Sequence, residues 1–120
     1  MVKSVRGAVK IAEDKPEQIM SGVSELIKAI YTKNTIKEKN TISIQFTQTK
    51  DIASINPARA LRSIGFKDVP LFCSQEPEYE GSVPKIIRVL VTYRCWKWKK
   101  AIPVYIQGAE KLRRDLFQGE

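Results

Sequence analysis

The sequence of 120 residues contains no histidine. This absence removes the commonest general base, the commonest metal ligand and any serine–histidine or cysteine–histidine nucleophile. The two cysteines, Cys73 and Cys95, are too few for a disulfide scaffold and fit a reducing compartment. No apolar run approaches the ~18 residues of a membrane span, and the first seven residues lack the apolar stretch of a signal peptide. We therefore expect a cytoplasmic protein with no membrane partner. If it is an enzyme, its chemistry needs little proton transfer or uses Glu or Tyr.

Positive charge is what the sequence holds in excess. Lysine and arginine number 21 against 13 aspartates and glutamates, which gives a formal net charge of +8. Between residues 94 and 114, seven basic residues meet one acidic residue. This balance favours an anionic partner, either a nucleic acid or a small carboxylate or phosphate ligand. The turn 95–101, C-W-K-W-K-K-A, suits stacking on bases, but it equally suits covering a core edge or a subunit contact. A nucleic-acid-binding module is therefore the alternative function.

The length suits a single domain over residues 1–120, without repeat or linker. Alternation of apolar and polar residues predicts five strands, at 2–11, 41–47, 69–73, 86–93 and 102–106. With two helices between them, the order is β-α-β-α-β-β-β. This order favours an α+β (α/β) fold, a sheet with two helices packed on one face. The other face then needs a cover, which so short a chain can gain by forming an oligomer.

Both predicted helices have recognisable beginnings. The first starts at a capping box formed by Asp14 and Glu17 and ends near Tyr31. Its apolar stripe faces the core and consists of Ile19, Met20, Val23, Leu26, Ile27 and Ile30. The second helix, 57–65, opens with a proline, and Asn56 is its expected N-cap.

Two residues are unusual within their predicted strands. Gly7 interrupts the first strand, which indicates a bulge or a close backbone approach, including one by a ligand. Arg88 interrupts an apolar strand, where an arginine is costly to bury unless an anion meets it. Glu76, in the preceding loop, suits either anchoring a hydroxyl or lying in solvent. Cys73 has no nearby cysteine at metal-binding spacing and fits a small buried hydrophobe.

A group of arginines invites a common explanation. Taken singly, Arg6 on a strand face, and Arg59 and Arg62 three apart on one helix face, fit solvated side chains. Taken with Arg88, and with Glu76 and Tyr105 as partners, they fit a site for a dicarboxylate.

Five segments of the chain resemble the monofunctional, trimeric α/β class of chorismate mutase, the Bacillus type. They are S-V-R-G-A at 4–8, P-A-R-A-L-R at 57–62, V-P-L-F-C-S-Q-E at 69–76, I-R-V-L at 87–90, and V-Y-I at 104–106 with L-R-R-D-L at 112–116. Each segment is short, but together they keep the order and nearly the spacing of the family over almost the whole chain. The sequence departs from the family pattern at Asn56, Phe72 and Arg114 and in the shorter, more basic turn 95–101.

The resemblance implies ferredoxin-like subunits whose sheets form the pseudo-barrel of a homotrimer, with active sites between subunits. The implied reaction is the pericyclic (Claisen) rearrangement of chorismate to prephenate, in phenylalanine and tyrosine biosynthesis. The reaction needs no cofactor, metal or covalent intermediate, which agrees with the lack of histidine, and no nucleic-acid partner is implied. The tail, about 107–120, is implied to be mobile and to cap the ligand.

The resemblance also implies roles for particular residues. The catalytic set is Arg88, Glu76 and Arg6, with Arg88 donating to the ether oxygen as its C–O bond breaks. Arg6 and Tyr105 would bind a carboxylate, Glu76 would hold the ring hydroxyl, and Arg62 would come from the adjacent subunit. The full set implied to bind substrate is Arg6, Arg59, Arg62, Phe72, Cys73, Ser74, Gln75, Glu76, Arg88, Tyr105 and Leu112.

Overall fold

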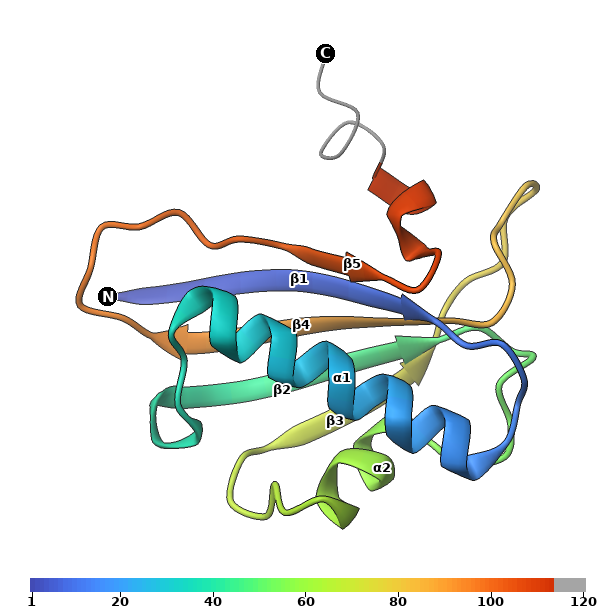
Figure 1. Cartoon of the computed structure of the whole chain (residues 1–120), viewed down its shortest axis with the longest axis horizontal. Helices are drawn as coiled ribbons and strands as arrows, with labels where there is room; N and C mark the ends of the chain where they lie inside the picture. The colour runs from blue at the N-terminus through green and yellow to red at the C-terminus, as the bar shows by residue number, and fades with distance from the viewer. Residues whose placement is uncertain (114–120) are drawn as a thin grey trace.

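The computed structural model describes residues 1–113 (Figure 1). The expectations for Arg114, and for the part of the tail beyond residue 113, lie outside the described residues. The sheet is built from β1 (Val2–Lys10), β2 (Thr41–Gln48), β3 (Leu71–Gln75), β4 (Ile86–Arg94) and β5 (Val104–Ile106).

The sheet is mixed, with the strand order β3-β2-β4-β1-β5. Central strand β4 runs antiparallel to both β1 and β2. The outer strands β3 and β5 run parallel to their neighbours, β2 and β1. The crossover between the parallel strands β2 and β3 contains helix α2 (Pro57–Ser63), as such a pair requires. The predicted order of strands and helices and the mixed α+β class are confirmed.

Helix α1 (Pro16–Asn34) and α2 lie on the same face of the sheet, as predicted (Figure 1). Side chains of both helices and of the sheet form one buried core, which includes Leu26, Ile30, Leu61, Phe46 and Val91. Burying each such side chain contributes ~1.5–3 kcal/mol, so this shared core holds the two helices against the strands.

The ends of α1 differ from the prediction. Lys15 is the N-cap, and no side chain caps this end. The carboxylate of Asp14 instead accepts hydrogen bonds from the backbone N–H groups of Ala53 and Ser54, at 2.9 and 3.1 Å. Both hydrogen bonds lower the pKa of Asp14, and the bond from Ala53 has the larger effect. The predicted capping box was therefore wrong, and α1 also extends to Asn34, beyond the predicted end.

Two strands start later than predicted. β3 begins at Leu71 instead of Val69, and β5 begins at Val104 instead of Ile102. The side-chain amide of Asn34 binds both the N–H and the carbonyl of Ile102, at 2.7 and 3.0 Å. Because α1 holds its backbone in this way, Ile102 does not join the sheet.

The close approach predicted at Gly7 is present, and it is made by protein atoms. A Cβ added at Gly7 would lie 2.8 Å from Cδ1 of Ile30 and 2.9 Å from the carbonyl oxygen of Val104. Glycine therefore allows α1 and β5 to pack closely against the middle of β1.

Within residues 1–113, the other face of the sheet is covered at one end. There Ala8, Ile86, Tyr105 and Ala109 form a second, smaller apolar cluster. Ala109 belongs to the short 3-10 helix η2 (Ala109–Arg113), so the described part of the tail packs against the sheet. No helix of the described residues is long and apolar enough to cross a bilayer.

Candidate active site

The strand register places a row of residues, three of them predicted site residues, across the face of the sheet that lies away from the helices. We call this face the open face. Ser74, Thr47, Arg88, Ala8 and Tyr105 are successive partners on β3, β2, β4, β1 and β5. Neighbouring strands lie about 4.8 Å apart. Because β1 lies between β4 and β5, two such spacings separate the backbones of Arg88 and Tyr105 by roughly 10 Å. The row thus brings residues from distant parts of the sequence to one surface.

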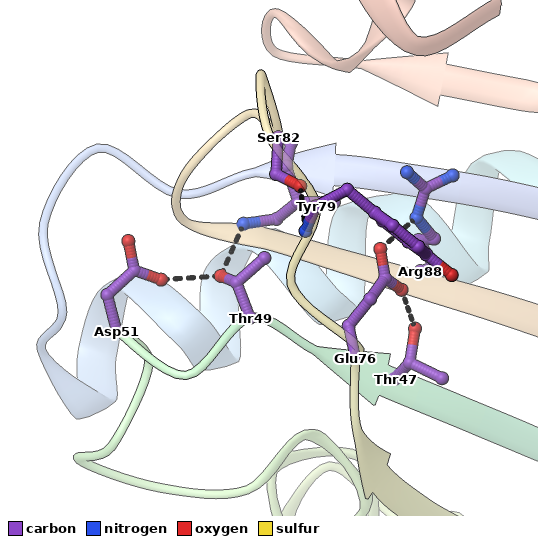
Figure 2. Close-up of polar contacts among 8 residues, drawn as sticks. Thr47, Thr49, Asp51, Glu76, Tyr79, Ser82 and Arg88 are labelled. Atoms are coloured by element: carbon purple, nitrogen blue, oxygen red, sulfur yellow. Dashed lines mark hydrogen bonds and ion pairs between the residues drawn. The ribbon is translucent and has the colours of Figure 1, made fainter.

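An ion pair joins Glu76 to Arg88 in this row (Figure 2). Nε of Arg88 donates to Oε2 of Glu76 at 2.6 Å, and the hydroxyl of Thr47 donates to Oε1. The side chains of Glu76 and Arg88 are 17% and 40% exposed. The anion expected to meet Arg88 is therefore Glu76. Figure 2 shows the two terminal nitrogens of Arg88 turned away from Glu76, in an orientation suited to a second anion.

Backbone pairing fixes the position of Glu76. Its N–H donates to the carbonyl of Gln48 at 2.7 Å, which extends the pairing of β2 with β3 past the last residue of β3. Pro77 follows and, lacking an N–H, favours the end of the strand there. The carboxylate is consequently held beside Thr47 and Arg88 by the sheet itself.

A pocket of about 440 Å³ adjoins the ion pair. Its walls are the segment 49–51, the loop 76–84, Arg88, Lys111 and Leu112. This volume falls within the range of sites for small molecules, about 300–1,000 Å³. Leu112 therefore lies at the same pocket as Glu76 and Arg88.

The two loops of the pocket wall are held by their own hydrogen bonds. Asp51 accepts from the hydroxyl of Thr49 and from the N–H of Lys85, which has a left-handed conformation with φ of 54°. In the other loop, the hydroxyl of Ser82 accepts from the N–H of Tyr79 at 2.9 Å (Figure 2). These hydrogen bonds hold both loops in place around the pocket.

Cys73 lies behind β3, on the side of the helices. Its thiol donates to Oε1 of Gln48 at 3.1 Å, and the side chain of Gln48 donates to the carbonyl of Ile52 at 2.7 Å. Burial raises the pKa of the Cys73 thiol. The half-buried thiol is therefore protonated at neutral pH and acts as a packing group, close to the prediction.

Arg6 and Tyr105 lie on the face of Arg88 but outside its pocket. Arg6 pairs with Leu90 in the sheet and lines a separate hollow of about 300 Å³, together with Arg113. Tyr105 is 6% exposed and belongs to the second apolar cluster. Tyr105 is the last residue of the row and Arg6 lies beside the row on β1, and neither lines the pocket within residues 1–113.

The remaining predicted residues lie on two other surfaces. Arg59 and Arg62 are exposed on α2, across the sheet from Arg88. On the outermost strand β3, the exposed residues are Phe72, Ser74 and Gln75. One chain by itself therefore does not bring the α2 arginines to the pocket.

Thr47 is a site residue that the sequence analysis did not identify. It was predicted only as the last residue of the strand 41–47, and its importance arises from the register that pairs it with Arg88. Thr49 and Asp51 lie outside every predicted strand and helix, and their hydrogen bonds join segments far apart in sequence. A strand alternation pattern gives the face of a residue but not its partner.

The site is a ligand-sized pocket with a fixed arginine at its wall, on the open face of an α+β sheet. Comparison with known families assigns the chain to a class. The family model described as chorismate mutase type I matches residues 2–116. The chain belongs to that family and is an isomerase, a chorismate mutase, as predicted.

Individual relatives agree with this assignment. The protein named chorismate mutase AroH from Thermus thermophilus is 37% identical over 118 residues, covering 97% of each chain. The protein of the same name from Bacillus subtilis (strain 168) is 30% identical over 118 residues, covering 97% of this chain and 93% of its own. A solved chorismate mutase from Clostridium thermocellum has a TM-score of 0.86 at 34% identity, over 91% of this chain and 98% of its own.

Proposed function

We propose that the chain rearranges chorismate to prephenate in the pocket beside Glu76 and Arg88, for phenylalanine and tyrosine biosynthesis. One C–O bond breaks while one C–C bond forms within the same molecule, so no proton is transferred and no group leaves the molecule. The ether oxygen gains negative charge as its bond to carbon breaks. The observation that carries the proposal is Arg88, a cation fixed at the pocket wall by Glu76 and Thr47.

In this mechanism Arg88 stabilises the transition state more than the substrate. Its terminal nitrogens donate to the ether oxygen, where charge develops, and to a neighbouring carboxylate. The ion pair with Glu76 holds the guanidinium in place, so little reorganisation accompanies the reaction. Loss of one such donor typically costs about 10²–10³-fold in rate.

Other residues of the open face bind and restrict the substrate. Glu76 accepts a hydrogen bond from the ring hydroxyl, because each carboxylate oxygen has a second lone pair beyond those used by Arg88 and Thr47. Arg6 and Tyr105 bind the carboxylate of the enolpyruvyl side chain. Together they hold a compact conformer, which lowers the entropic part of the barrier. Further contacts come from the backbone near Ser74, including that of Cys73 and Gln75, and from the side chains of Phe72 and Leu112.

The proposal includes a homotrimer in which the sheets form a pseudo-barrel. A neighbouring subunit supplies Arg62 to the site, and Arg59 nearby adds to the positive electrostatic potential there. Two observations support it. Arg59 and Arg62, on α2, lie across the sheet from Arg88 in their own chain. Phe72, which shares a face of β3 with Ser74, is 67% exposed. A cytoplasmic location is also proposed, supported by two cysteines that are both free.

The test of the reaction is the loss of chorismate absorbance, with prephenate identified as product. Arg88→Ala is expected to lose about 10²–10³-fold or more in turnover, and Arg88→Lys keeps the charge but loses the fork of donors. Arg94→Ala, an exposed arginine of the same strand, is the matched control and is expected to keep full activity. Wild-type turnover by Arg88→Ala contradicts the assignment.

Mixing of two variants tests the shared site. Arg88→Ala and Arg62→Ala are each expected to be impaired as pure trimers. In trimers reassembled from an equal mixture, about a quarter of the sites combine an intact Arg88 with an intact Arg62 from the neighbour. Activity that does not recover after verified subunit exchange contradicts a site built from two chains.

A further inference from the structure

A second hollow of about 340 Å³ lies at the opposite end of the sheet from the pocket. Eight of its fifteen lining residues are lysine or arginine, and none is acidic. They come from separate segments and include Lys3, Lys33, Lys37, Arg94, Lys97 and Lys99. The ion pairs of residues 1–113 involve none of the eight. We call this site the basic hollow, and roughly 20 Å of strand β4 separates its edge at Arg94 from Arg88.

One tryptophan of the chain lines the basic hollow, and the other lies between two of its lining residues, Lys97 and Lys99. Trp96 lines it and is 89% exposed, and Trp98, two residues on, is 91% exposed. Large aromatic side chains are seldom left so fully in water in a folded protein. Neither packing in the core nor the mutase pocket explains why both indoles are exposed beside cations that form no ion pair.

The tryptophan loop, residues 95–101, nevertheless has a fixed backbone. Cys95 exchanges backbone hydrogen bonds with Met1, at 2.9 and 3.1 Å. Lys3 donates to the carbonyl of Lys97 at 2.8 Å, and Asn34 holds Ile102 by two hydrogen bonds. The loop thus presents Trp96 and Trp98 from an anchored frame, which reduces the ordering cost of binding.

We propose that the basic hollow binds single-stranded nucleic acid, with bases stacked on Trp96 and Trp98 and phosphates held by the surrounding lysines. Stacking on exposed aromatics beside a positively charged groove is how single strands are bound without sequence preference. This inference goes beyond the mutase activity, and it departs from the absence of a nucleic-acid partner implied by the family resemblance.

The shape of the site favours a strand over other anionic partners. A flat bilayer meets the projecting parts of a protein, whereas here Lys3, Lys33 and Lys37 line a concave surface shared by three segments. A row of phosphates can enter such a hollow while unpaired bases reach the two indoles. A duplex keeps its bases stacked on one another and offers the tryptophans nothing equivalent.

Tryptophan fluorescence supplies the assay, because Trp96 and Trp98 are the two tryptophans in the sequence. Titration with a twelve-residue oligo(dT) or oligo(U) at low salt is expected to quench this fluorescence saturably. The logarithm of affinity should fall with the logarithm of salt concentration, with a slope of about −0.7 per phosphate contact. The DNA and RNA arms distinguish which nucleic acid binds better, and a duplex of equal length should bind more weakly.

Variants separate the basic hollow from general positive charge. The triple variant Lys97→Ala, Lys99→Ala and Lys100→Ala should weaken binding of a labelled oligonucleotide and reduce the salt slope by about 2. The matched triple variant Lys15→Ala, Lys28→Ala and Lys67→Ala removes the same charge elsewhere and should have a much smaller effect. Trp98→Ala should weaken binding about tenfold. Mutase turnover should not change in any of them.

Several outcomes overturn the proposal. They are the absence of quenching by either oligonucleotide, equal losses in the two triple variants, and equal or tighter binding of the duplex. Binding to phosphatidylserine vesicles without binding to oligonucleotides assigns the site to membranes and likewise overturns it. Because the substitutions are confined to exposed side chains, circular dichroism is expected to confirm that each variant is folded.

Discussion

The ion pair between Glu76 and Arg88 should couple the stability of β3 to that of β4. Nε and Oε2 lie 2.6 Å apart, with side-chain exposures of 40% and 17%. Exposed pairs contribute about 0.2–1 kcal/mol, and removing one partner of a fully buried pair costs about 3–5 kcal/mol. Because this pair lies between the two cases, we expect a coupling energy of about 1–2 kcal/mol in the free energy of unfolding.

The assay is a double-mutant cycle of Glu76→Gln, Arg88→Met and the double variant. Urea unfolding is followed by far-ultraviolet circular dichroism at one fixed protein concentration, since an oligomer unfolds in a concentration-dependent way. The losses of stability in the two single variants should together exceed the loss in the double variant, because each single variant leaves one partner without its counterpart.

The exposed pair of Lys50 with Glu78 is the matched control. Its atoms lie 3.1 Å apart with exposures of 61% and 62%, so the cycle of Lys50→Met and Glu78→Gln should give a coupling below about 0.5 kcal/mol. Equal coupling in the two cycles, or additive effects in the cycle of Glu76 with Arg88, would refute the reasoning from partial burial.

Three further predictions follow from contacts away from the ion pair. Gly7→Ala should lower the free energy of unfolding by about 1–3 kcal/mol, because its Cβ would meet Ile30 and a backbone carbonyl; an unchanged urea midpoint would contradict this packing. Asn56→Ala should cost ~1 kcal/mol by removing the cap that accepts from the N–H of Arg59, and Asn56→Asp, which keeps an acceptor, should remain near wild type in thermal melts. Asp14→Asn should be less stable than wild type near neutral pH. The pKa of Asp14 in the folded state lies below its usual value of 3.8, so the stabilisation is present above that pH and lost as the pH falls through the folded-state pKa. A stability difference that persists unchanged at about pH 2 would contradict this assignment.

Local patterns were sufficient to predict the element order and the cap of α2. Asn56 and the proline after it form a signal within four residues, and the structure keeps it. Asp14 carries an equally good local signal, yet loop residues 39 and 40 positions away take its carboxylate. A capping pattern records what a side chain can do locally, and a tertiary partner decides whether it does so.

The residues of the site likewise divide into those that a local pattern reveals and those that only a tertiary contact reveals. Arg88 was identifiable because an arginine in an apolar strand requires an anion, and its motif resembles a known family. Thr47 was not identifiable, because its role depends on the register of β2 against β4, a pairing between residues 41 positions apart. The placement of Arg59 and Arg62 across the sheet from Arg88 also follows from the packing of α2, which no local spacing reveals.

The position of β4 has a consequence for synthesis of the chain on the ribosome. β4 is the only described strand that pairs with both β1 and β2, and its residues 86–94 follow the end of β1 by more than seventy positions. At ~5–20 residues per second, β1 waits on the order of several seconds for its antiparallel neighbour to be made. During this time α1 can form, but its apolar stripe has no completed sheet to cover. Folding of the sheet is therefore expected to wait until β4 has been made.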